Sequence, residues 1–66
     1  MRYRAEAYDL DTENLAANLG HFETRQEAVK ACEKHAGQSL IFIERRRGLW
    51  RASAAAHFYG VVDIAG

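Results

Sequence analysis

Residues 40–43, Leu-Ile-Phe-Ile, constrain the fold most strongly, because every residue of this run is apolar. A β-strand sends successive side chains to opposite faces of its sheet. Leu40 and Phe42 are therefore expected on one face, and the two isoleucines on the other. The rest of the chain predicts only one helix, and a single helix covers only one face of a sheet. The second face is predicted to keep an apolar stripe that needs a partner.

Length and composition indicate a single small domain, residues 1–66. A chain of this length buries about 60% of its unfolded surface, so its hydrophobic core is thin. The one cysteine, Cys32, cannot form an intrachain disulfide, which favours a reducing, cytoplasmic location. No apolar run approaches the roughly 20 residues of a membrane-spanning helix, so no membrane contact is expected.

A capping box at residues 24–27, Thr-Arg-Gln-Glu, predicts the start of a helix. The Thr24 hydroxyl can accept a hydrogen bond from the Glu27 amide, and the Glu27 carboxylate can reach back. Apolar residues then recur at helical spacing, and Gly37 stands where a left-handed C-cap belongs. We therefore predict a helix from about Arg25 to Ala36. Its buried side is mostly alanine, which allows it to lie close to a sheet.

The segment before this helix alternates in polarity. Arg2 to Asp9 predicts a first strand. Leu15 to Leu19 also alternates and favours a second strand paired with the first. Residues 12–20 are also compatible with a short helix capped by Asp11 or Thr12, so both alternatives stay open.

Three strands are expected after the helix. Ser39 to Glu44 predicts the first, and residues 45–48, Arg-Arg-Arg-Gly, predict a hairpin turn in which Gly48 can take a positive φ. The chain then returns as Leu49 to Ala54 and ends in a strand from Phe58 to Ile64. The order ββαβββ predicts an α+β domain, with a four- or five-stranded antiparallel sheet and one helix packed on one face.

The arginine-rich hairpin is the first candidate for partner binding. It comprises Arg45, Arg46, Arg47 and Arg51. Arginine is favoured at phosphates and at protein hot spots, so this tip fits a nucleic acid or a protein partner. It also fits a solvated hairpin that keeps the sheet edge from pairing with other chains.

The helix-free face is the second candidate. A contiguous apolar patch usually marks an interface, here with a protein partner or a second copy of the chain. The alternative is that the N-terminal segment or residues 54–56 fold over it. The residues expected there are Tyr8, Ile41, Ile43, Leu49, Tyr59 and Val61.

No motif identifies a reaction. Cys32 and His35 lie three residues apart on the predicted helix, whereas a zinc site needs converging ligands, most often four. A cysteine in mid-helix on the apolar side is poorly placed for nucleophilic attack, so Cys32 is expected in the core. Asp9, Asp11 and Glu13 lack the glycine and distal glutamate of a calcium loop. We expect no enzyme activity, no metal, no cofactor and no small-molecule substrate.

Residues 19–31, Leu-Gly-His-Phe-Glu-Thr-Arg-Gln-Glu-Ala-Val-Lys-Ala, resemble a known strand-to-helix passage. It occurs in plant AP2-type DNA-binding domains and in the arm-binding domains of phage integrases. Those domains place three strands rich in Arg and Trp before the passage to contact DNA. This chain has a shorter segment there and three predicted strands after the helix instead.

A longer similarity includes residues 22–31, Phe-x-Thr-x-x-Glu-Ala-x-x-Ala, and residues 48–52, Gly-Leu-Trp-x-Ala. With an apolar strand between them and a terminal strand after them, these motifs resemble small phage and mobile-element proteins. Among these are anti-CRISPR proteins that inhibit type I complexes. The resemblance implies a non-enzymatic, protein-binding module, an anti-CRISPR-like inhibitor that binds a host nucleoprotein complex. The alternative function is a nucleic-acid-binding domain that uses residues 45–51.

Overall fold

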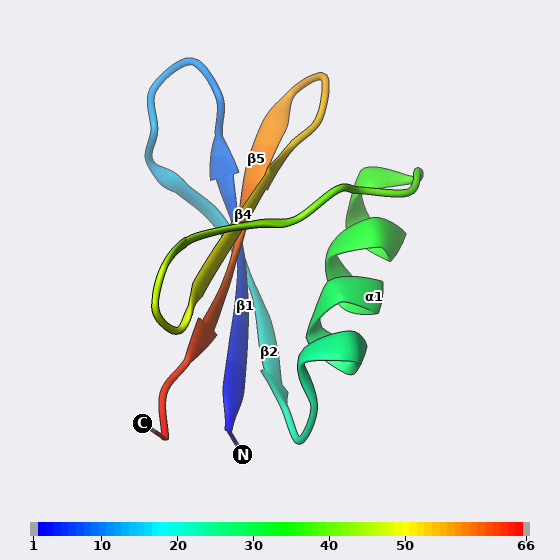
Figure 1. Ribbon diagram of the computed structural model, residues 1–66. Helices are drawn as coiled ribbons and strands as arrows, with labels where there is room; N and C mark the ends of the chain where they lie inside the picture. Colours follow the sequence, from blue (N-terminus) through cyan, green and yellow to red (C-terminus); the bar gives the residue numbers. More distant parts are fainter. Residues whose placement is uncertain (1, 66) are drawn as a thin grey trace.

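One helix lies across one face of a five-stranded antiparallel sheet (Figure 1). The computed structural model describes residues 2–65. The strands follow the order β2-β1-β5-β4-β3, so β2 and β3 are the edges of the sheet. The predicted α+β class and ββαβββ order are confirmed. The elements are β1 (Tyr3–Asp9), β2 (Leu15–Phe22), α1 (Arg25–Ala36), β3 (Ile43–Arg46), β4 (Leu49–Ser53) and β5 (His57–Asp63).

The helix has the bounds that its capping residues predict. The Thr24 hydroxyl accepts a hydrogen bond from the Glu27 amide at 3.2 Å, and Glu27 Oε1 accepts one from the Thr24 amide at 3.1 Å. Gly37 ends the helix with a φ of 73°, and its amide donates to the Glu33 carbonyl. No helix within residues 2–65 is long and apolar enough to cross a membrane.

Residues 15–22 form a strand, so the alternative of a short helix within residues 12–20 is wrong. Strand β2 pairs with β1 along its length, with two register shifts. At one shift Gly20 takes a φ of 112°, and its amide donates to the Asn18 side chain at 3.0 Å. Pairing with β1 satisfies the backbone groups on the inner side of β2 and places Leu19 and Phe22 against the core, which outweighs the local helix signal.

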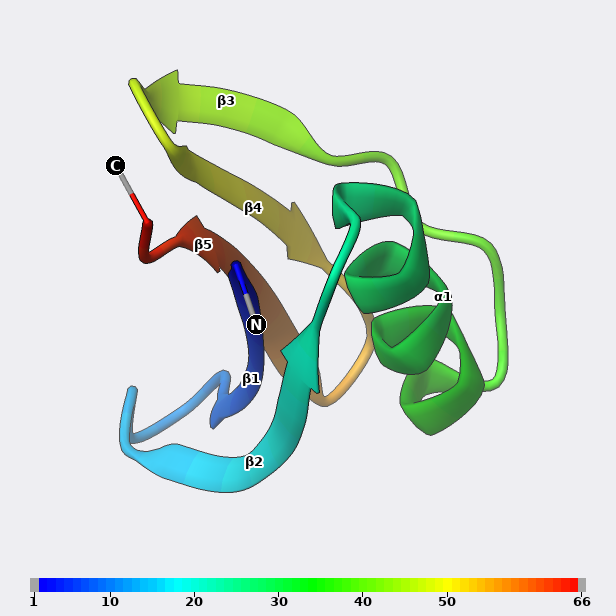
Figure 2. The same ribbon diagram turned by 90° about the horizontal axis from the view of Figure 1, so that it is seen from below.

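The core lies between α1 and the middle strands, and it combines small residues with two large ones. Across the β1–β5 pair, Ala5 lies opposite Val61 and Ala7 lies opposite Tyr59. All four are completely buried, as are Ala28 and Cys32 from the helix. The alanines let α1 approach β1, β2 and β5, which are the strands it contacts. Figure 2 shows α1 toward the β2 side of the sheet, with β3 at the opposite edge.

The prediction that Tyr59 and Val61 lie on the helix-free face is wrong, because both are 0% exposed beneath α1. Alternation along β5 separates its side chains into two sets but does not say which set the helix covers. The register with β1 decides this, because Ala5 and Ala7 leave space under the helix that only large neighbours can fill.

The alternation at residues 40–43 is confirmed, although β3 begins later than predicted, at Ile43, and extends to Arg46. Leu40 and Phe42 pack against the core. Ile41 is 84% exposed and Ile43 is 58% exposed. The side chains of this run therefore separate into a covered set and a solvent-facing set.

Candidate interaction surface

The face of the sheet opposite α1 is called the open face below. Register and alternation define it, because residues paired directly across strands project from the same side. The core residues of β1, β5 and β4 face the helix, so their sequence neighbours face away from it. The open face comprises Arg4, Glu6, Tyr8, Leu15, Asn18, His21, Phe58, Gly60, Val62, Leu49, Arg51, Ser53, Ile43 and Arg46.

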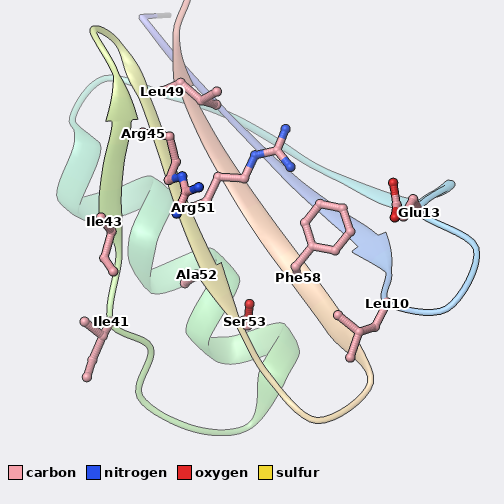
Figure 3. Close-up of a pocket in the computed structure, with 10 residues that line it drawn as sticks. All are labelled: Leu10, Glu13, Ile41, Ile43, Arg45, Leu49, Arg51, Ala52, Ser53 and Phe58. Carbon is pink, nitrogen blue, oxygen red and sulfur yellow. The ribbon is translucent and has the colours of Figure 1, made fainter.

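A hollow of about 720 Å³ opens on this face (Figure 3). Exposed Ile41 and Ile43 stand at its β3 edge, Leu10 and Phe58 stand on the other side, and Arg51 lies between them. We call it the apolar hollow, because aliphatic and aromatic side chains supply much of its wall. Its lining residues are Leu10, Glu13, Ile41, Ile43, Arg45, Leu49, Arg51, Ala52, Ser53 and Phe58.

At the centre of the open face, an arginine guanidinium lies over a pair of stacked aromatic rings. The rings of Tyr8 and Phe58, paired across β1 and β5, lie 5.0 Å apart between centroids and 11° from parallel. The Arg51 guanidinium carbon lies 5.7 Å from the Tyr8 centroid and 5.2 Å from the Phe58 centroid. Contacts of this kind hold a guanidinium in place without neutralising its charge.

A β-bulge gathers the hairpin arginines on the open face. On β4, Trp50 pairs with Glu44 and Leu49 pairs with Arg46, so Arg45 is an extra residue without a partner. Strict alternation would send Arg45 and Arg46 to opposite faces. The bulge instead lets Arg45 line the apolar hollow while Arg46 lines a neighbouring hollow of the same face.

This second hollow measures about 280 Å³ and is called the arginine hollow. The carboxylate that lines this hollow belongs to Glu6, and it already contacts two neighbouring side chains. Glu6 Oε2 lies 3.1 Å from Arg4 Nε, and Glu6 Oε1 accepts a 2.5 Å hydrogen bond from the Tyr8 hydroxyl. Partial burial and this hydrogen bond raise the pKa of Tyr8, so its hydroxyl stays a donor. The lining residues are Arg4, Glu6, Tyr8, Arg46, Arg47, Leu49, Arg51, Gly60 and Val62.

Most residues predicted from the sequence to bind a partner line these two hollows, whereas the buried Tyr59 and Val61 do not. The residues brought together are Arg45, Arg46, Arg47, Arg51, Ile41 and Ile43. Arg4, Leu10 and Phe58 were not predicted as members. Alternation within β1 and within β5 assigns Arg4 and Phe58 each to a side of its own strand. Only the pairing of β1 with β5 shows that these two sides belong to the same face of the sheet.

On the covered side, the Cys32 thiol is completely buried, and this burial raises its pKa to about 12. The thiol is therefore a packing group at neutral pH. His35 Nδ1 lies 2.9 Å from the Tyr59 hydroxyl, which joins the last turn of α1 to the core of β5. Within residues 2–65, no group of three or more His, Cys, Asp or Glu side chains is arranged to hold a metal ion.

Comparison of the chain with models of protein families, with curated proteins and with solved structures finds no match. The open face and its two hollows are therefore the features of this chain that indicate a function.

Proposed function

We propose that this domain binds another protein through its open face, with the apolar hollow as the anchoring contact. The observation that carries the proposal is the exposure of Ile41 and Ile43 beside Leu49 and Phe58 in one hollow. Burying one aliphatic side chain completely is worth about 1.5–3 kcal/mol, so a partner that covers both isoleucines gains a substantial part of its binding energy there.

The charge of this surface supports an acidic partner rather than a second copy of the chain. Arg45 and Arg51 stand in the wall of the apolar hollow, and Arg46 and Arg47 stand in the next one. A two-fold dimer whose axis passes through these hollows would bring the arginines against one another, and like-charge contacts across an interface cost several kcal/mol. A partner with an apolar projection ringed by carboxylates complements both features.

A sharper form of the proposal follows from the resemblance of residues 22–31 and 48–52 to small anti-CRISPR proteins. The partner would then be a subunit of a host nucleoprotein complex, and binding would inhibit that complex. Expression of the chain in cells with an active type I system should restore phage growth. Ile43→Asp should abolish the effect. Unchanged phage restriction in the presence of the folded protein would exclude this form of the proposal.

The general proposal is tested by placing a charge in the apolar hollow. Ile43→Asp should weaken partner binding at least tenfold, because a carboxylate cannot be buried against an apolar projection at low cost. The matched control is Gln26→Asp, which adds the same charge at an exposed position of α1, on the other side of the sheet and outside both hollows. A partner captured from source cells by the tagged protein would be purified, and its affinity for both variants measured by calorimetry.

Three measurements decide the result. Binding that survives in Gln26→Asp, is lost in Ile43→Asp and protects the amides of residues 43–51 from hydrogen exchange supports the proposal. Equal binding by both variants contradicts it. Light scattering that shows a dimer of the isolated chain, dissociated by Ile43→Asp, assigns the face to a second copy instead.

A nucleic-acid partner is the second candidate, because the bulge collects Arg45 and Arg46 beside Arg4, Arg47 and Arg51. Binding to backbone phosphates should weaken steeply as salt concentration rises, whereas apolar docking should change little. A short single-stranded oligonucleotide would be titrated at several salt concentrations. A steep slope that flattens in the variant Arg45→Gln/Arg46→Gln/Arg47→Gln favours nucleic acid, and the absence of binding at low salt excludes it.

A further inference from the structure

The arginine hollow holds more positive charge than its own carboxylate can balance. Four arginines and one glutamate line it, and that glutamate already contacts Arg4 and Tyr8. The ion pairs of the residues that the structure describes are Arg2–Asp63 and Arg4–Glu6, and neither involves the other three arginines of the hollow.

Glu44, the carboxylate of the β3–β4 hairpin, does not line the hollow. Its Oε2 accepts a 3.4 Å hydrogen bond from the Gly48 amide across the turn. The guanidinium of Arg51 is held by aromatic rings, which orient it and leave its charge intact. Arg46, Arg47 and Arg51 therefore converge on one hollow, and none of them forms an ion pair within residues 2–65.

At the base of the arginine hollow lies a residue that has no side chain, Gly60. Gly60 is buried in the middle of β5, between Glu6 on β1 and Arg51 on β4. A Cβ atom built at this position would meet only the Tyr8 ring, with Cε2 at 3.7 Å. Glycine weakens a strand interior, and it is found where another group approaches the backbone closely. Gly60 thus leaves space for a ligand atom between the arginines.

We propose that the arginine hollow is a binding site for a dianionic phosphate group, either free phosphate or a phosphomonoester. Guanidinium groups match the oxygens of a tetrahedral oxyanion with paired hydrogen bonds. Arginines from β1, the β3–β4 hairpin and β4 surround one compact space, which suits a single dianion better than an extended phosphodiester chain. The site rests on the arginines and Gly60, so it stands even where protein binding through the apolar hollow fails.

The test is a titration of the purified chain with inorganic phosphate and, separately, with phosphoserine. Amide chemical shifts would be followed at constant ionic strength. We expect saturable shifts at residues 46–51 and at Gly60, with an affinity at least tenfold lower in Arg46→Gln/Arg47→Gln. The matched control is Lys30→Gln/Lys34→Gln, which removes the same charge from exposed positions of α1 and should change the affinity less than twofold.

A second variant tests the shape of the site at constant charge. Gly60→Ala places a methyl group on the floor, and we expect at least threefold weaker phosphate binding with the thermal unfolding transition retained. Equal weakening by the lysine and arginine variants, or an unchanged affinity in both Arg46→Gln/Arg47→Gln and Gly60→Ala, would overturn the proposal. Tighter binding of a single-stranded oligonucleotide than of either phosphate probe at the same phosphate concentration would also overturn it.

Discussion

Replacing Tyr59 with alanine is expected to unfold the domain at 25 °C. Tyr59 is completely buried, and its direct neighbours on β1 and β4 are Ala7 and Ala52, which are too small to fill the space it would leave. Deleting a buried aromatic side chain costs about 3–5 kcal/mol. A single core in a chain of fewer than about 70 residues rarely supplies more than about 3–5 kcal/mol of stability, so this loss removes most or all of it. Circular dichroism of the purified variant should show the loss of a cooperative thermal transition.

Two control variants accompany this one. The first removes only the hydroxyl of Tyr59, and the second truncates the adjacent aromatic residue, which lies on the other face of the sheet. Tyr59→Phe keeps the ring and removes the 2.9 Å contact with His35 Nδ1, which should cost about 0.5–1.5 kcal/mol. Phe58→Ala removes the neighbouring ring from the open face, where it is half-buried, and should cost about 1–2 kcal/mol. A Tyr59→Ala variant as stable as Phe58→Ala would contradict the burial of Tyr59 beneath α1.

The contrast between residues 58 and 59 shows where the sequence was informative and where it was not. Local signals were sufficient for the helix, because Thr24 bonds to Glu27 at its start and Gly37 bonds to Glu33 at its end, each within four residues. The strands were also predictable from alternation, and the segment at residues 40–43 separates into two faces as expected. Assigning one of those faces to the helix required the long-range register between β1 and β5, which alternation within a single strand does not contain.

The candidate site was only partly predictable, because it too depends on how distant strands pair. Residues 45–48 were expected to form the turn, but Arg45 and Arg46 belong to β3 and the turn is confined to residues 47–48. The arginines themselves were identified because they cluster in the sequence. The bulge that places Arg45 and Arg46 on one face depends on how β3 pairs with β4 across only a few residues. Arg4 and Gly60 complete the arginine hollow from β1 and β5, and no local pattern links them to the hairpin. The sequence thus indicated the chemistry of the surface, and the sheet topology supplies its arrangement.

The second large effect is expected at alkaline pH, where the buried Cys32 thiol should make the fold unstable. Burial against the sheet raises the pKa of this thiol from 9.0 to about 12. The unfolded chain therefore loses the proton first, and between these pH values the folded state binds more protons than the unfolded state. The free energy of unfolding must then fall as pH rises through this interval, and it is unaffected by Cys32 below it. From pH 9 to pH 11, a pKa difference of this kind corresponds to a loss on the order of 2–3 kcal/mol.

The variant Cys32→Ala separates the effect of the thiol from that of two tyrosines, whose deprotonation also lowers the free energy of unfolding at high pH. Burial also raises the pKa of Tyr59 and of Tyr8 above the ordinary value of 10.0, so the wild-type chain and Cys32→Ala should both lose stability at the highest pH. Only the wild-type chain should lose it from about pH 9 onward, because only that chain has the thiol. Urea unfolding at intervals from pH 8 to pH 11 measures both curves. Parallel curves for the two proteins would mean that Cys32 is not held away from water in the folded state, and α1 would then have to lie further from the sheet than its row of alanines allows.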